Sequence, residues 1–191
     1  GDYDTALEYN SRSLKLAEEF GDKQEFGDIF LSHGFLYYKQ GEYNMALDYY
    51  THALEIYEKF DINENIPNLF ANIGLVYFQQ ENYKKAVEYL EKSATIQMDF
   101  NNTIILETIS HLFLSKKLLS KEYNVSEIHT LIKEEDEIED YINFALFKLL
   151  EDTSYLETAY NQIQEKADNL EPDIAAKFLS YPIPAAIVEE W

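Results

Sequence analysis

The chain has 191 residues, of which 46% are hydrophobic and 27% are charged, so it can bury a core and is not a disordered tail. Asp and Glu number 36 against 15 Lys and Arg, and the net charge of -21 argues against binding to nucleic acid or to an anionic membrane surface. The acidic side chains are expected to solvate the outer faces of the protein, and they leave room for a basic partner. The absence of cysteine excludes disulfides, a thiolate nucleophile and a cysteine zinc site.

The chain has no feature that would direct it to a membrane or to secretion. No apolar run reaches the roughly 18 residues that a membrane span needs, and no signal peptide opens the sequence. We therefore expect a cytoplasmic protein. The sequence begins at Gly1, inside the first repeat described next, which predicts that the chain is cut from a longer protein.

An internal repeat of constant period is the strongest pattern in the chain. The segments GDYDTALEY, GEYNMALDY and ENYKKAVEY begin at Gly1, Gly41 and Glu81, and a phenylalanine closes each unit at Phe20, Phe60 and Phe100. Between them, apolar residues fall at helical spacing. Each unit is therefore predicted to form two antiparallel amphipathic helices joined by a tight turn.

Small residues recur where the two helices of a unit should meet. Gly34 on the first helix and Ala46 on the second are placed where the helix axes must approach closely, because a larger side chain would hold them apart. Gly41 lies between the two helices and is expected to end the first one.

The repeated positions resemble the tetratricopeptide repeat. The first complete unit carries Phe30, Gly34, Tyr37, Ala46, Tyr50 and Ala53, and the next carries Phe70, Gly74, Tyr77, Ala86, Leu90 and Ala94. The usual unit has about 34 residues. The 40-residue form is similar to the repeats of kinesin light chains, polarity adaptors and large bacterial signalling proteins. The resemblance implies an all-α fold, an α-α superhelix of antiparallel helix pairs, which acts in protein–protein interaction.

The whole chain, residues 1–191, is predicted to form a single helical array. Its parts are regular repeats at 1–100, degenerate helical repeats at 101–170, with helices at 102–119, 141–150 and 155–170, and a C-terminal cap at 171–191. The cap is expected to hold two short helices at 172–180 and 184–191, with Trp191 packed on the last helical pair. The acidic run EEDEIED at 134–140 is predicted to be a solvated loop or helix start, since it lacks the residue order of a calcium loop.

The C-terminal segment carries a second resemblance. From Tyr155 onwards, the chain is similar to the C-terminal end of large multidomain bacterial proteins, through Ala159-Tyr160, Phe178-Leu179, Ile187 and Trp191. Those proteins combine a signal-sensing ATPase with cyclase, kinase or DNA-binding parts and with tetratricopeptide repeats. The resemblance implies that the chain regulates domains that precede it.

No residue constellation in the sequence supports catalysis. The four histidines, His33, His52, His111 and His129, are scattered and form no metal signature, and His33 is expected to be a packed core residue. Neither a glycine-rich phosphate loop nor a Gly-x-Ser-x-Gly motif occurs. We expect no enzymatic activity, no cofactor and no bound metal.

The resemblance to tetratricopeptide repeats also implies a concave groove lined by the first helix of each unit. The implied partner-binding residues are Leu31, Ser32, Phe35, Tyr38 and Lys39, followed in the next unit by Asn68, Asn72, Leu75, Phe78 and Gln79. The strongest candidate is Asn72, whose amide can both donate to and accept from a peptide backbone. In the alternative, Asn72 bonds an adjacent helix while Phe35 and Leu75 pack on neighbouring repeats. Because Lys39 is the only cation of the set, a clamp for chaperone C-terminal carboxylates is not expected.

The leading functional hypothesis is a scaffold module that binds a peptide or a helix of another protein in this groove. Two alternatives stay open. One is an intramolecular regulatory domain of a multidomain bacterial signalling protein, and the other is a structural spacer that self-associates into a homo-oligomer.

Overall fold

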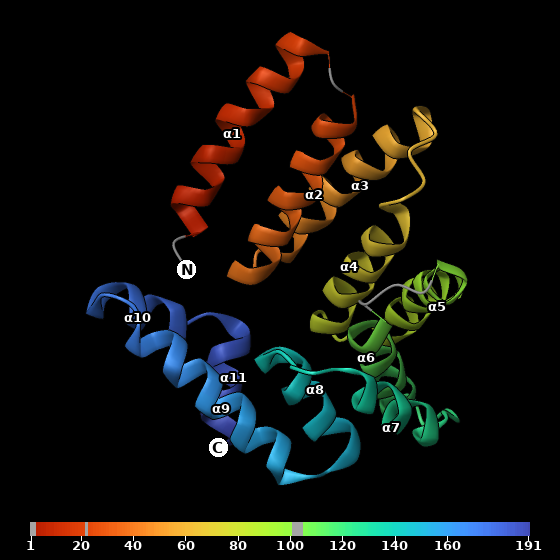
Figure 1. Cartoon of the computed structure of the whole chain (residues 1–191), viewed down its shortest axis with the longest axis vertical. Coiled ribbons are helices and arrows are strands. Elements are labelled where there is room, and N and C mark those ends of the chain that lie inside the picture. Colours follow the sequence, from red (N-terminus) through yellow and green to blue (C-terminus); the bar gives the residue numbers. More distant parts are fainter. Residues whose placement is uncertain (1–2, 22, 101–104) are drawn as a thin grey trace. The chain divides into compact units, whose positions relative to one another are not determined.

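The computed structural model describes residues 3–21, 23–100 and 105–191, and every regular element within them is an α-helix (Figure 1). The all-α fold built from helix pairs is thereby confirmed. The chain divides into two compact units, residues 2–100 and residues 101–191. None of the helices in the described ranges combines the length and the apolar character that crossing a bilayer requires.

The first unit consists of five helices. These are α1 (Tyr3–Phe20), α2 (Lys23–Gln40), α3 (Tyr43–Lys59), α4 (Ile66–Gln79) and α5 (Tyr83–Phe100). Helix α2 pairs with α3 and α4 pairs with α5, while α1 packs on α2 and α3 packs on α4. The unit therefore holds two full repeats, α2–α3 and α4–α5, preceded by α1, which corresponds in sequence to the second helix of a repeat.

The turns at the ends of α2 and α4 have the same backbone geometry. Gly41 has a φ of 84° and its N–H donates to the carbonyl of Tyr38, at 3.0 Å. Glu81 occupies the equivalent place in the next repeat with a φ of 58°, and its N–H donates to the carbonyl of Phe78 at 2.9 Å. This left-handed residue after a helix satisfies carbonyl groups that the helix leaves unpaired. Glu81 adopts the conformation although glycine suits it better.

The close approach predicted at Gly34 is confirmed, but its neighbour is Tyr50. A Cβ added to Gly34 would lie 2.5 Å from Cδ1 of the Tyr50 ring, and one added to Gly74 would lie 2.7 Å from Cγ of Leu90. Both neighbours are fully buried, as is Ala46. The repeat thus seats a large side chain of the second helix directly on a glycine of the first. The side chains of Phe20 and Phe100 lie outside the described residues, and Phe60 is exposed.

The second unit is made of shorter helices. These are α6 (Ile105–Leu118), α7 (Val125–Glu134), α8 (Asp140–Leu150), α9 (Thr153–Asp168), α10 (Pro172–Leu179) and α11 (Pro182–Glu190). Helix α6 contacts α7 and α8, α8 pairs with α9, and both α10 and α11 pack on α9. Fully buried Leu146, Ile163 and Ile187 come from α8, α9 and α11 and form the core.

Several predicted boundaries of this unit change. The first helix is described from Ile105 only, so that residues 102–104 of the prediction lie outside the described residues. The last helix begins at Pro182 rather than at 184, because a proline fits the first turn, where its missing N–H costs no hydrogen bond. Trp191 stacks on Tyr160 of α9 with ring centres 5.0 Å apart, which confirms its packing on the last helical pair.

Candidate functional site

The predicted site residues of α2 form a partly open surface. Leu31 and Lys39 are half-buried, Ser32 is exposed, and Phe35 leaves 42% of its surface accessible. The ammonium group of Lys39 lies 5.1 Å from the centre of the Phe35 ring, close enough for a cation–π interaction. The hydroxyl of Ser32 accepts a hydrogen bond from Asn10 of α1, at 3.0 Å. This surface therefore presents an aromatic ring with a cation over it.

Tyr38 and Gln79 connect repeats, so the expectation that both face an open groove is wrong for Tyr38. That side chain is only 6% exposed, and its ring lies 6.1 Å from the ring of Tyr43. The Gln79 amide donates to the Tyr38 hydroxyl over 3.5 Å, from the end of α4 to the end of α2. Tyr38 is buried because the end of α2 packs against the beginning of α3 in the same repeat and against the end of α4 in the next repeat.

The predicted residues of α4 are less exposed than expected. Leu75 is 3% exposed, which contradicts its assignment as an open inner position. The reason is that α4 is apolar around most of its circumference, and a helix of this kind is covered on several sides. Asn68 is half-buried, and its Oδ1 is enclosed without a hydrogen-bond partner in the described residues. Phe78 is half-buried, with its ring 5.6 Å from that of Tyr83.

Asn72 retains its hydrogen-bonding capacity. The residue is half-buried, and in the part of the chain that the structure describes its amide makes no hydrogen bond to a neighbouring helix. The alternative in which Asn72 serves only to bond an adjacent helix therefore finds no support. A half-open amide of this kind can donate to and accept from a ligand backbone.

His33 is a core residue, as predicted. It is 3% exposed, its Nδ1 lies 2.9 Å from the carbonyl oxygen of Ile29, and its ring stacks on Tyr49 with 5.0 Å between centres. Within the described ranges, no group of three or more His, Asp or Glu side chains could hold a metal ion.

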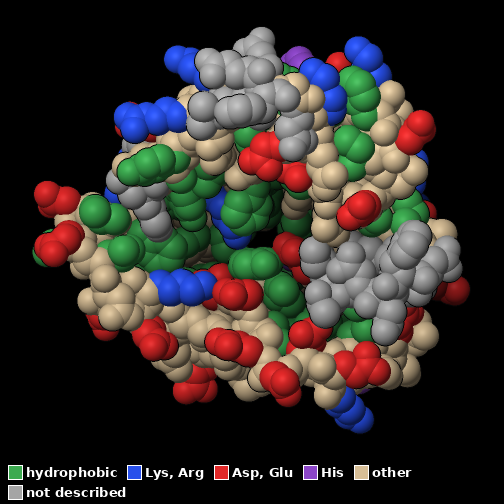
Figure 2. All heavy atoms as spheres, turned by 45° about the horizontal axis from the view of Figure 1, so that its top comes forward, with side chains coloured by type: hydrophobic (Ala, Val, Ile, Leu, Met, Phe, Trp, Pro, Cys, Tyr) green, Lys and Arg blue, Asp and Glu red, His purple; other side chains and the backbone are tan. Residues whose placement is uncertain are grey.

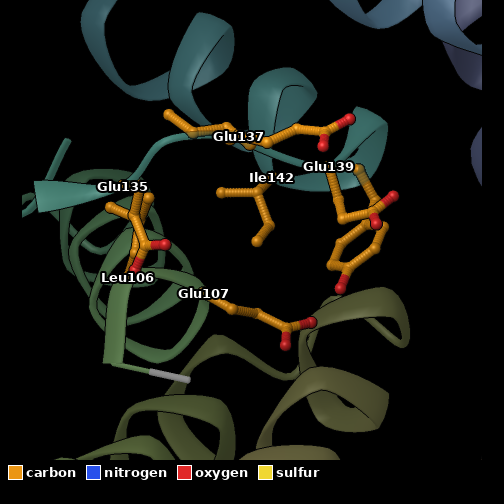
Figure 3. Close-up of a pocket in the computed structure, with 8 residues that line it drawn as sticks. Leu106, Glu107, Glu135, Glu137, Glu139 and Ile142 are labelled. Atoms are coloured by element: carbon orange, nitrogen blue, oxygen red, sulfur yellow. The ribbon is translucent and has the colours of Figure 1, made fainter. Parts of the chain in front are cut away.

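A second surface, which sequence reasoning missed as a site, lies in the unit of residues 101–191. It is a cavity of about 180 Å³ between α6, α8 and the loop that precedes α8 (Figure 3). Its apolar lining consists of Leu106, Ile138, Tyr141 and Ile142, and its acidic lining consists of Glu107, Glu135, Glu137 and Glu139. The run at 134–140, predicted to be a solvated loop or helix start, forms a largely exposed loop at 135–139 between α7 and α8, and this loop is also one wall of the cavity.

The electrostatic environment of this cavity is strongly negative. Burial raises the pKa of Tyr141, and the nearby carboxylates of Glu107 and Glu139 raise it further, because they disfavour a phenolate. The ammonium group of Lys166 lies 3.0 Å from a Glu139 carboxylate oxygen and 2.7 Å from that of buried Asp140. Acidic side chains also recur over the face drawn in Figure 2, with Lys and Arg sparser.

Comparison with known proteins identifies the repeats. A family model described as tetratricopeptide repeat matches residues 1–59 and residues 25–99, which together cover 99 of the 191 residues. No curated protein matches the chain.

Proposed function

Because the chain belongs to the tetratricopeptide repeat family, whose repeats generally mediate protein–protein interaction, we propose that it binds a peptide segment of another protein along α2 and α4. The repeat register makes Ser32 of α2 equivalent to Asn72 of α4, and Phe35 equivalent to Leu75. Corresponding residues of neighbouring repeats face the same way. The face that carries Phe35 on α2 therefore continues past Asn72 on α4.

The observation that carries the proposal is the unpaired, half-open amide of Asn72 on the same repeat face as the accessible ring of Phe35. A peptide needs both contributions. An amide side chain that pairs with the peptide backbone fixes the position of the peptide, and an aromatic ring supplies the apolar anchor that dominates binding energy.

The test is a selection of random 12-residue peptides on the intact chain, followed by affinity measurements on two variants. The first variant carries Phe35→Ala and Asn72→Ala. The matched control carries Phe60→Ala and Asn63→Ala, which remove the same side-chain types from exposed positions outside this face. We expect selected peptides to lose at least tenfold in affinity for the first variant only, because truncating a hot-spot anchor costs about 2 kcal/mol or more and tenfold corresponds to about 1.4 kcal/mol.

Peptides that bind both variants equally would refute the proposal. No observation in the described residues favours the regulatory or the self-association alternative, and both stay predictions.

A further inference from the structure

We propose that the cavity between α6 and α8 receives an arginine side chain from a basic segment of the partner. The inference rests on the proposed role in protein binding, but it concerns a different surface, in the unit of residues 101–191.

The size of the cavity matches one long side chain. Its volume is about 180 Å³, whereas pockets for drug-sized ligands span about 300–1,000 Å³. Leu106 and the two isoleucines of the lining provide apolar surface for a hydrocarbon stem, and Figure 3 shows Ile142 projecting into the middle of the space. A purely polar ligand would leave this surface without a partner.

The charge of the lining selects a cation. Four of the eight lining residues are glutamates, and none is Lys or Arg. Lys166 pairs with Glu139 at the edge, but within the described ranges Glu135 and Glu137 form no ion pair and no side-chain hydrogen bond. A positive group that enters the cavity would therefore meet two carboxylates that have no cation of their own.

The distribution of the carboxylates favours arginine over a metal ion or lysine. In Figure 3, Glu135 and Glu139 lie on opposite sides of Ile142, and Glu107 lies across the space from Glu137, so the carboxylates do not converge on one point. No group of metal-binding side chains occurs in the described residues. A guanidinium group carries five N–H donors in a planar fork and is weakly hydrated, so it can reach separated carboxylates while its face rests on apolar surface. The lysine ammonium is compact and strongly hydrated.

The test measures binding of a fluorescein-labelled peptide, acetyl-Gly-Arg-Gly-Arg-Gly-Arg-Gly-amide, to the intact chain by fluorescence anisotropy. The probe is compared with versions in which lysine or the uncharged isostere citrulline replaces each arginine. The pocket variant is Glu135→Gln with Glu137→Gln. The control variant is Glu122→Gln with Glu157→Gln, two exposed glutamates outside the lining. Both variants change the net charge equally, so the difference in affinity between them excludes general attraction of the peptide to the acidic surface.

We expect the arginine peptide to bind about tenfold more weakly to the pocket variant than to the control, which corresponds to two partly exposed ion pairs. The lysine peptide should bind more weakly than the arginine peptide to the unmodified chain, and the citrulline peptide should not bind. Circular dichroism spectra that coincide for the variants would establish that folding is unchanged.

Equal weakening in both variants, equal binding of the arginine and lysine peptides, or no binding of the arginine peptide would overturn the proposal. The outcome is separable from the binding along α2 and α4. The Phe35→Ala/Asn72→Ala variant should bind the arginine peptide like the unmodified chain, and weakening there instead would assign the basic segment to α2 and α4. If the arginine peptide does not bind in the cavity, the selection of 12-residue peptides still tests independently whether a peptide binds along α2 and α4.

Discussion

Replacing Gly34 by alanine tests how closely α2 and α3 are packed. The new Cβ would lie 2.5 Å from Cδ1 and 3.0 Å from Cζ of the Tyr50 ring. Favourable contacts between carbon atoms lie at about 3.5–4.0 Å, so the ring or the helix must move by about 1 Å. The Tyr50 side chain is fully buried, so it cannot avoid the clash by turning into solvent.

The expected cost follows from two opposing contributions. Overpacking of a core costs about 1–3 kcal/mol, and a clash with a buried ring belongs at the upper end of that range. Alanine is more favourable than glycine inside a helix by about 0.8–1.0 kcal/mol. The net loss of unfolding free energy for Gly34→Ala should therefore be about 1–2 kcal/mol.

Urea unfolding followed by far-ultraviolet circular dichroism measures this loss. For a loss of about 1–2 kcal/mol and an m-value of about 1–3 kcal/mol/M, the urea midpoint should fall by about 0.3–2 M. A double-mutant cycle identifies the cause, because in the Tyr50→Ala background the same Gly34→Ala change meets no ring and should become neutral or stabilising. An unchanged or raised midpoint for Gly34→Ala alone would refute the proposed contact.

Four further substitutions test other parts of the fold. Ala46→Leu places a large side chain at a fully buried position and should lower the unfolding free energy by about 1–3 kcal/mol, and an unaltered melting temperature would contradict the packing. Glu81→Gly should stabilise the chain by about 1 kcal/mol in urea titration, because it removes a left-handed non-glycine residue at φ 58°, while Gly41→Ala should do the reverse at φ 84°. If Glu81→Gly and Gly41→Ala were both as stable as the unmodified chain, that account of the turns would be contradicted. Lys117→Met should cost about 1–2 kcal/mol, because the ammonium group bonds two carbonyl groups at the end of α8. The hydrogen bond from Lys117 also holds the pKa of Glu151 below its ordinary value. The stabilisation that this Lys117–Glu151 pair contributes is therefore present above the unfolded-state pKa of Glu151, and it is lost as the pH falls through the folded-state pKa of Glu151. An NMR titration should show this pKa rising in Lys117→Met, and an unchanged pKa would exclude the pair as its cause.

The helix pairs of the first unit could be predicted because their determinants are local. Glycine marks both the end of α2, at Gly41, and the place where Tyr50 rests on Gly34, and the constant repeat period carries the prediction to α4 and α5. Glu81 is an instructive exception. Its own side chain disfavours a left-handed backbone, and only its alignment with Gly41 indicates that the turn is the same.

The exposure of the candidate site residues could not be predicted to the same extent. The repeat register says that Tyr38 and Phe78 occupy equivalent positions, but it does not say which neighbour covers each one. Tyr38 is buried against Tyr43 and bonded by Gln79, whereas Phe78 stays half-open. Such differences depend partly on contacts between one repeat and the next, which spacing along a single helix does not reveal.

The acidic cavity escaped prediction for a related reason. Glu107 and Glu137 are distant in sequence, and only the packing of α6 on α8 brings their segments to one cavity. The alternation of acidic residues with Ile138 is a local signal, since it allows an apolar side chain to face inward while its neighbours stay wet. Composition alone does not distinguish this arrangement from a fully solvated run.

Comparison of the two repeats separates positions that hold the fold from positions that can recognise a partner. Gly34 and Gly74 are identical because each admits a large side chain of the paired helix. On the face of α2 and α4 proposed to bind a peptide, by contrast, Phe35 corresponds to Leu75 and Lys39 to Gln79. The equivalent positions also differ in exposure, since Phe35 is exposed whereas Leu75 is buried, although the turns that end α2 and α4 form the same backbone hydrogen bonds. A ligand bound along this face would therefore meet a cation and an exposed ring on α2 and a neutral amide surface on α4, which fixes the direction in which an asymmetric peptide can lie.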